Sequence, residues 1–165
     1  MWHKKSFLFF LPYKKFLKNF LGKQTSKTYI IDIGSGIAEI HLKHKYKLLL
    51  FDNSFSCLRA ASRIIGTNHK AILCDFFEKY FCSKIELDDK NKVIILAINI
   101  LHNHVSNLEK VLYFAKINNF KKLVFDIPKN MLISNYLKFI TEEYEINKIY
   151  DGESRTIFEV QINTF

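Results

Sequence analysis

Residues 29–38 read YIIDIGSGIA, and this stretch decides the fold. Residues 28–33 are mostly β-branched or aromatic, which predicts a short strand. Gly34–Gly36 predicts a sharp turn at which the backbone can approach a ligand closely. Polar and apolar residues in 37–45 are spaced as in a helix, and the first amides of such a helix would face an anion. Asp32, at the end of the strand, can accept a hydrogen bond from a ligand ammonium group.

A glycine turn after a strand is also found in enzymes that bind dinucleotides. Their fingerprint, G-x-G-x-x-G, takes Gly or Ala at its last position, where this chain has Glu39. A carboxylate there would repel a pyrophosphate. The small residue falls instead at Ala38, which gives D-x-G-x-G-x-A. The pattern therefore disfavours a dinucleotide site.

The rest of the chain alternates between short apolar runs and segments with helical spacing. The further predicted strands are 47–51, 71–74, 92–100, 122–127, 145–150 and 156–162, and the further predicted helices are 14–23, 57–65, 105–118 and 131–144. Such alternation indicates βαβ units and a mostly parallel sheet. A turn at 151–152 separates the last two strands, which therefore pair as a hairpin or place one strand antiparallel between neighbours. We predict an α/β fold with a seven-strand, mostly parallel sheet and an antiparallel C-terminal strand.

Four features, in the same order along the chain, resemble those of class I S-adenosylmethionine-dependent methyltransferases. D-x-G-S-G at 32–36 resembles motif I of the family, although Ala38 stands where glycine is more usual. Asp52 and Asp75 end the second and third predicted strands, as acidic residues do in the family. Residues 97–104, AINILHNH, are similar to the N-x-L-H-H type segment after strand four of many small-molecule methyltransferases. The resemblance runs from about residue 28 to the C-terminus and implies a three-layer, Rossmann-like fold.

The resemblance also implies a role for each of these residues toward S-adenosylmethionine. Gly34, Ser35 and Gly36 would approach the methionine moiety, Asp32 its ammonium group, Asp52 the ribose hydroxyls and Asp75 the adenine amino group. Phe76 or Phe55 would supply an apolar wall for the base, and Asn99 is a further candidate. Asn99 does not lie in an N-P-P-Y type segment, the usual signature for adenine N6.

Methyl transfer from a sulfonium is an in-line displacement, so positioning the acceptor supplies much of the catalysis. If a base is needed, His102 is the candidate, because it follows the fourth strand and an unperturbed histidine titrates near neutrality. A surface histidine without a catalytic role is the alternative. His41 and His44 are expected on a solvated face beside Lys43 and Lys45, and no metal site is predicted.

The chain has 165 residues, a formal net charge of +9 and a pI near 9.4. This charge suits a partner rich in phosphate, although a general drift toward Lys, Asn, Ile and Phe would also raise it. Residues 1–27 are predicted to be a basic amphipathic helical extension, and residues 28–165 the cofactor-binding domain. The extension would pack on the domain edge or, less favoured, contact a membrane surface or a nucleic acid. Three cysteines without CxxC spacing suggest neither disulfides nor zinc, which fits a cytoplasmic protein.

The sequence therefore predicts a methyltransferase that uses S-adenosylmethionine and acts on a small metabolite or an RNA, with a partner subunit as an option. Two other readings stay open. One is a methyltransferase fold without activity that binds a partner protein or nucleic acid. The other is a nucleic-acid or membrane-surface binding module that depends on the basic helix.

Overall fold

The computed structural model describes residues 11–66, 69–101, 105–131, 134, 140 and 143–162. Its strands are β1 (Tyr29–Ile33), β2 (Lys47–Asp52), β3 (His69–Leu73), β4 (Val93–Ala97), β5 (Lys122–Pro128), β6 (Glu145–Asp151) and β7 (Arg155–Gln161). Its α-helices are α1 (Pro12–Gly22), α2 (Phe55–Ile65) and α3 (Val105–Asn118). The described residues also form three short helical turns, namely η1 (Glu39–His41), the π-helical η2 (Phe76–Tyr80) and η3 (Lys90–Lys92).

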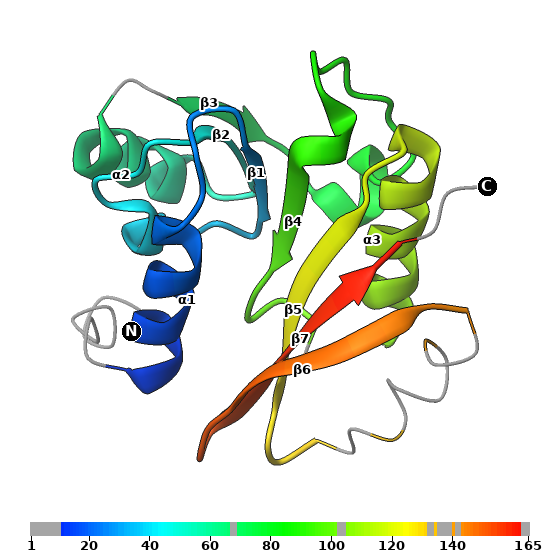
Figure 1. Ribbon diagram of the computed structural model, residues 1–165. Coiled ribbons are helices and arrows are strands. Elements are labelled where there is room, and N and C mark those ends of the chain that lie inside the picture. Colours follow the sequence, from blue (N-terminus) through cyan, green and yellow to red (C-terminus); the bar gives the residue numbers. More distant parts are fainter. Residues whose placement is uncertain are drawn as a thin grey trace.

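The strands form one seven-stranded sheet in the order β3-β2-β1-β4-β5-β7-β6 (Figure 1). The first five strands in this order pair in parallel, and β7 lies antiparallel between β5 and β6. The predicted α/β fold, with a mostly parallel sheet and one antiparallel strand near the C-terminus, is confirmed.

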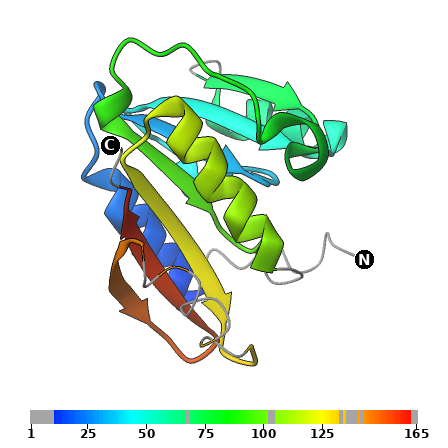
Figure 2. The same ribbon diagram turned by 90° about the vertical axis from the view of Figure 1, so that its right-hand side faces the viewer.

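Helices cover both faces of the sheet, because the central strands carry apolar side chains on both sides (Figure 2). On one face, Ile31 and Ile95 belong to a core that α3 covers with Leu108 and Phe114. On the other, α1 and α2 contribute to a second core that contains Ile30, Leu50 and Leu96 from the strands. None of the helices that the structure describes has the length and apolar composition needed to cross a membrane.

Two predicted elements differ from the observed ones. The helix predicted over 37–45 is wrong, because the left-handed backbone of Ala38 and Lys43, at φ 56° and 63°, limits helical structure there to the single turn η1. The strand predicted over 92–100 ends at Ala97, since Asn99 also has a positive φ of 63°. The helix predicted over 131–144 lies largely outside the described residues.

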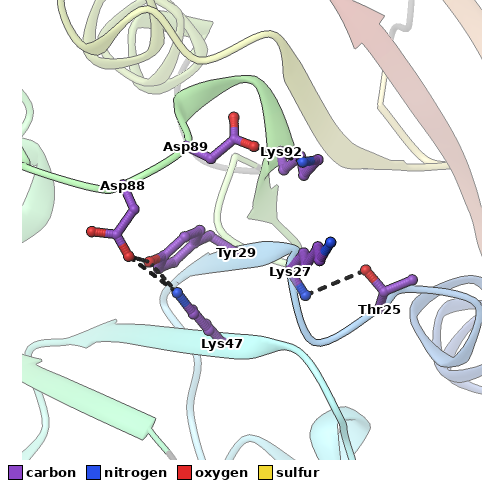
Figure 3. A network of polar contacts seen from close by, with 7 residues as sticks. All are labelled: Thr25, Lys27, Tyr29, Lys47, Asp88, Asp89 and Lys92. Atoms are coloured by element: carbon purple, nitrogen blue, oxygen red, sulfur yellow. Dashed lines mark hydrogen bonds and ion pairs between the residues drawn. The ribbon is translucent and has the colours of Figure 1, made fainter.

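A polar cluster lies at the amino ends of β1 and β2 (Figure 3). The Tyr29 hydroxyl donates to Asp88 Oδ2 at 2.9 Å, and Lys47 Nζ donates to the Tyr29 hydroxyl at 2.7 Å. The hydrogen bond from Tyr29, followed by the Lys47 ammonium, holds the pKa of Asp88 below its usual value. The glycine turn follows the carboxyl end of β1, so this cluster lies at the other end of the strands. We therefore regard it as part of the structure and not of the candidate site.

Helix α1 is bound to the sheet by Leu17 and Leu21, whose side chains are 0% and 1% exposed. The division between an extension and a domain at residue 27 remains a prediction. We expect Leu17→Ala to lower the free energy of unfolding by about 2–5 kcal/mol, as truncation of a buried leucine does. Denaturant unfolding followed by circular dichroism measures this change.

The matched control is Lys15→Ala, an exposed position on the same helix, where a change within about 0.5 kcal/mol is expected. Equal and small losses for the two variants would mean that α1 is a separable extension.

Candidate functional site

The candidate site lies at the carboxyl ends of β1, β2, β3 and β4. Ile33 pairs with Phe51 in β1 and β2, and Asp52 pairs with Leu73 in β2 and β3. This register places Asp52 directly beside the turn that begins at Gly34. Ligands of open parallel sheets bind outside the carboxyl ends of the strands, at the point where the strand order reverses, which here lies between β1 and β4.

The glycine turn has a fixed backbone. The amides of Gly34 and Ser35 both donate to the Phe51 carbonyl, at 2.8 and 3.1 Å, and the Gly36 amide donates to Asp52 Oδ2 at 2.8 Å. The sequence placed free amides at the start of a helix over 37–45, which is only the single turn η1, and the amides of Gly34, Ser35 and Gly36 hold the glycine turn to β2. Gly34 has a φ of 69°, and a Cβ there would clash with Ile100 Cγ2, so a glycine is required.

Ser35 carries the feature of this turn that points to a ligand. Its hydroxyl oxygen is buried and has no hydrogen-bond partner among the described residues. A buried polar atom without a partner costs about 1–3 kcal/mol, so it needs an explanation. Next to it, Gly36 has a φ of 55° and open space where a Cβ would lie. The turn therefore offers one hydroxyl and an open backbone face to a bound group.

Asp52 is half-buried and connects the turn to helix α2. Its Oδ2 accepts from the Gly36 amide and its Oδ1 from the Ser54 amide, both at 2.8 Å. The Ser54 side chain then accepts from the Cys57 amide and caps the start of α2. A carboxylate has about four acceptor positions, so each oxygen of Asp52 can still accept from a hydroxyl.

Asp75 and the two candidate phenylalanines lie after β3 and at the start of α2. Asp75 Oδ1 accepts from the amides of Phe77 and Glu78, at 3.1 and 3.2 Å, and so caps η2. Phe76 is 4% exposed and packs edge-on against Phe51 and Phe114 in the core. Phe55, by contrast, is 64% exposed. Of the two rings proposed as a wall for a base, only that of Phe55 faces solvent.

Cys74 precedes Asp75 in the sequence and lies near enough to Asp75 and Asp52 for both charges to act on its thiol. Burial raises the pKa of its thiol, and the charges of Asp75 and Asp52 raise it further. The thiol therefore stays protonated at neutral pH. A nucleophilic cysteine at this position is not supported.

Asp32 belongs to a buried chain of hydrogen bonds that the sequence did not indicate. His41 Nε2 lies 2.8 Å from Asp32 Oδ2, and His41 Nδ1 lies 2.8 Å from the Tyr46 hydroxyl. His41 is 0% exposed, so its expected place on a solvated face is wrong. The carboxylate only accepts, so Nε2 carries a proton, and in a neutral ring Nδ1 accepts from Tyr46.

Tyr46 is suited to that donor role. Burial, and then the charge of Asp32, raise the pKa of its phenol well above the usual value, so the hydroxyl keeps its proton. Asp32 itself is 4% exposed. Its predicted contact with an ammonium group stays a prediction, and Oδ1 is the oxygen that His41 does not engage.

A second polar group lies near the ends of β4 and β5. The Asn99 amide donates to Asp126 Oδ1 at 2.6 Å, and Arg155 donates to Asp126 Oδ2 and, at 2.6 Å, to Asn99 Oδ1. Arg155 also lies over the Tyr13 ring of α1, 5.3 Å from its centre. Burial raises the pKa of Tyr13, while the Arg155 charge opposes this shift. Asn99 is thereby fixed with its side-chain oxygen already engaged.

Sequence reasoning missed the partner of Asp32 because His41 was expected on a solvated helix face, and it missed the partners of Asn99 because they are 27 and 56 residues away in sequence. The only signal for His41 and Tyr46 was their closeness to the glycine turn, and nothing marked Asp126 or Arg155. His102, the candidate base, lies outside the described residues. Within the part of the chain that the structure describes, no cluster of His, Cys, Asp and Glu could hold a metal ion.

The buried chain of hydrogen bonds predicts a specific pattern of stability losses. We expect His41→Ala to lower the free energy of unfolding by about 2–4 kcal/mol, since it leaves a cavity and a buried carboxylate that lacks its partner. Tyr46→Phe removes only one hydroxyl and should cost about 1 kcal/mol. Urea unfolding at neutral pH measures both changes.

His44→Ala is the matched control, because His44 is a half-buried histidine nearby whose Nδ1 lies 2.9 Å from a backbone carbonyl and not from a carboxylate. If His41→Ala were as mild as His44→Ala, the hydrogen bond to Asp32 would contribute little to the fold.

Comparison with known proteins places this geometry in a known fold. No family model matches the sequence, and no curated protein sequence matches it significantly. Solved structures do match: the N-methyltransferase NodS from Bradyrhizobium japonicum has a TM-score of 0.65 at 11% identity, covering 91% of this chain and 94% of its own. Magnesium protoporphyrin IX methyltransferase from Synechocystis, solved with bound S-adenosylmethionine, has a TM-score of 0.62 at 10% identity, covering 92% and 80%.

An rRNA methylase from Streptococcus thermophilus matches with a TM-score of 0.58 at 10% identity, covering 91% of this chain and 93% of its own. These matches span nearly the whole chain and agree with the observed strand order. The chain therefore has the fold of the class I S-adenosylmethionine-dependent methyltransferases.

Proposed function

We propose that the chain is a methyltransferase that binds S-adenosylmethionine and acts on a small metabolite or an RNA. The observation that carries this proposal is the buried, unpartnered Ser35 hydroxyl, in a glycine turn bonded to Asp52 at the carboxyl edge of the sheet. The solved neighbours support the cofactor, since one of them was determined with S-adenosylmethionine bound. Others carry the names of an N-methyltransferase and an rRNA methylase, which agrees with both substrate classes.

The residues present fit the cofactor. The Ser35 hydroxyl and the open backbone face at Gly36 suit its methionine end, and both Asp52 oxygens can accept from vicinal ribose hydroxyls. Phe55 offers an exposed ring to the base. When bound, S-adenosylmethionine supplies a sulfonium methyl group for in-line transfer. The protein contributes mainly by holding the acceptor near attack geometry.

His102 remains our candidate for a general base, because it follows β4 in the sequence, and the acceptor would lie at the carboxyl end of that strand. Arg155 supports this edge through Asp126 and Asn99. It contributes by positioning, since its contacts with Asp126, Asn99 and the Tyr13 ring are all with protein groups.

A binding subunit without activity is the second candidate function. One observation favours it: the three carboxylates assigned to the cofactor all serve the fold. Asp32 bonds to His41, Asp52 to the Gly36 and Ser54 amides, and Asp75 to the amides of η2. Cofactor binding decides between the two candidates.

The test is calorimetric titration of the full chain with S-adenosylmethionine. We expect saturable binding to the wild type, and a loss of at least about tenfold in affinity for Asp52→Ala, since a hydrogen bond to a charged group is worth about 1.5–3 kcal/mol. Asp88→Ala is the matched control, because it removes the same charge from an exposed site at the opposite edge of the sheet.

Circular dichroism of Asp52→Ala must show a folded protein, because the side chain also holds the Gly36 amide. Wild-type protein that takes up no S-adenosylmethionine would rule out the enzyme and favour the binding subunit. Equal affinities for Asp52→Ala and Asp88→Ala would remove Asp52 from the site.

A further inference from the structure

Helix α1 and the segment between η1 and β2 enclose an open groove of about 680 Å³. Its charged and polar lining includes Lys18 of α1, Lys23 directly after α1, and Lys43 and His44 from the other side, and its apolar lining includes Ile40 and Leu42. We call this the α1 groove. The two walls lie side by side in the fold (Figure 1). The segment that forms the second wall follows η1, which comes after the glycine turn.

The charge of the α1 groove is one-sided. Lys18, Lys23 and Lys43 are exposed, and within the described part of the chain none of them forms an ion pair with an acidic side chain. Lys14, one helical turn before Lys18, differs because it forms an ion pair with Glu39. None of the described residues that line the groove is acidic. The groove therefore presents exposed ammonium groups that no acidic side chain of the described residues neutralises.

Lys43 has an unusual backbone conformation for a residue with a long side chain. Its φ is 63°, in the left-handed region that favours glycine. Such a conformation at a non-glycine residue suggests a function when the surroundings give that side chain a role. Here the feature is the groove, because Lys43 closes the basic wall opposite Lys18 and Lys23.

The shape and the apolar packing of α1 argue against a membrane surface as the partner. A helix that lies on a membrane inserts an exposed apolar face. In α1 that face is occupied, since Tyr13, Leu17 and Leu21 are buried and Phe16 packs against Tyr150. The charged side that remains is concave, which fits an extended chain of anions better than a flat surface.

The spread of the charges also favours a chain over a single anion. Lys18 and Lys23 are separated by about 7.5 Å along the helix axis, at 1.5 Å per residue. Lys43 approaches from the facing wall. Lysines along a groove track a phosphate backbone and gain from the release of its counterions.

We propose that the α1 groove binds the phosphate backbone of a single-stranded RNA. Given the proposed methyltransferase function, on which this step rests, the inference names RNA as the substrate class. The groove extends from Ile40 of η1, which follows the glycine turn, to Tyr46 beside the amino end of β2, so a strand lying along it would lead from that end of the sheet toward the glycine turn.

The test measures binding of a fluorescein-labelled single-stranded RNA of mixed sequence to the full chain, by fluorescence anisotropy across a salt series and without cofactor. The test variant is Lys18→Ala/Lys23→Ala/Lys43→Gly. The matched control is Lys70→Ala/Lys79→Ala/Lys84→Ala, which removes the same charge at exposed positions outside the groove.

Each lysine lost from a phosphate contact should reduce the slope of log K against log salt by about 0.7. The groove variant should therefore lose about 2 in slope and, near 0.1 M salt, roughly a hundredfold in affinity. The control should lose only a few-fold. If the two variants weaken binding equally, or the wild type binds no RNA, the proposal is overturned.

Lys43→Gly alone guards against a folding defect, because glycine accepts the positive φ at this position. Its melting temperature should match or exceed that of the wild type, while RNA affinity falls about fivefold. Unchanged RNA affinity in this folded variant would remove Lys43 from the site. Binding to phosphatidylserine vesicles that depends on the three lysines, in place of RNA binding, would overturn the proposal in favour of a membrane.

Calorimetry with S-adenosylmethionine separates the two proposals. The groove variant should bind the cofactor as the wild type does, which would place RNA binding apart from cofactor binding. If no variant and no wild-type protein bound the cofactor, the methyltransferase proposal would fail, and the anisotropy result would still decide whether the groove binds RNA.

Discussion

The hydrogen bond from the Gly36 amide to Asp52 is the interaction on which the candidate site depends. It joins the turn after β1 to the end of β2, and through Ser54 the same carboxylate reaches the first turn of α2. With three amides of the turn already engaged by β2, the loop has its shape before any ligand arrives. The Ser35 hydroxyl is the polar group of this loop that the described fold leaves unsatisfied.

On the face of the sheet that α1 covers, polar side chains also hold the loop after the glycine turn in place. Asp32 points to His41 and Tyr46, so η1 is held against β1 by a polar chain that is buried beneath α1. Glu39, the residue that breaks the dinucleotide fingerprint, pairs with Lys14 of that helix. The loop after the glycine turn is therefore fixed from below by Asp32 and from the side by α1. The part of the loop that stays exposed to solvent contains Lys43.

Most of the fold could be predicted because it rests on apolar runs. The strands at 28–33, 47–51 and 122–127 are continuous runs that only a sheet covered on both faces explains, and Asp52 was placed correctly because it ends such a run. The partner of Asp32 could not be predicted. Positive φ values at Ala38 and Lys43 interrupt a segment whose spacing looks helical, and neither residue type signals such a conformation. Arg155 meets Asp126 only because β7 enters beside β5, a pairing that spacing alone left open.

The insertion of β7 between β5 and β6 has a consequence for synthesis on the ribosome. β5 emerges well before β7, so Val124 and Phe125 and one full row of backbone amides and carbonyls stay uncovered while the intervening chain is made. An open apolar strand edge is a template for pairing with other chains. The nascent protein therefore passes through a stage in which the edge of β5 is unpaired, and a chaperone that shields strand edges would act at that stage.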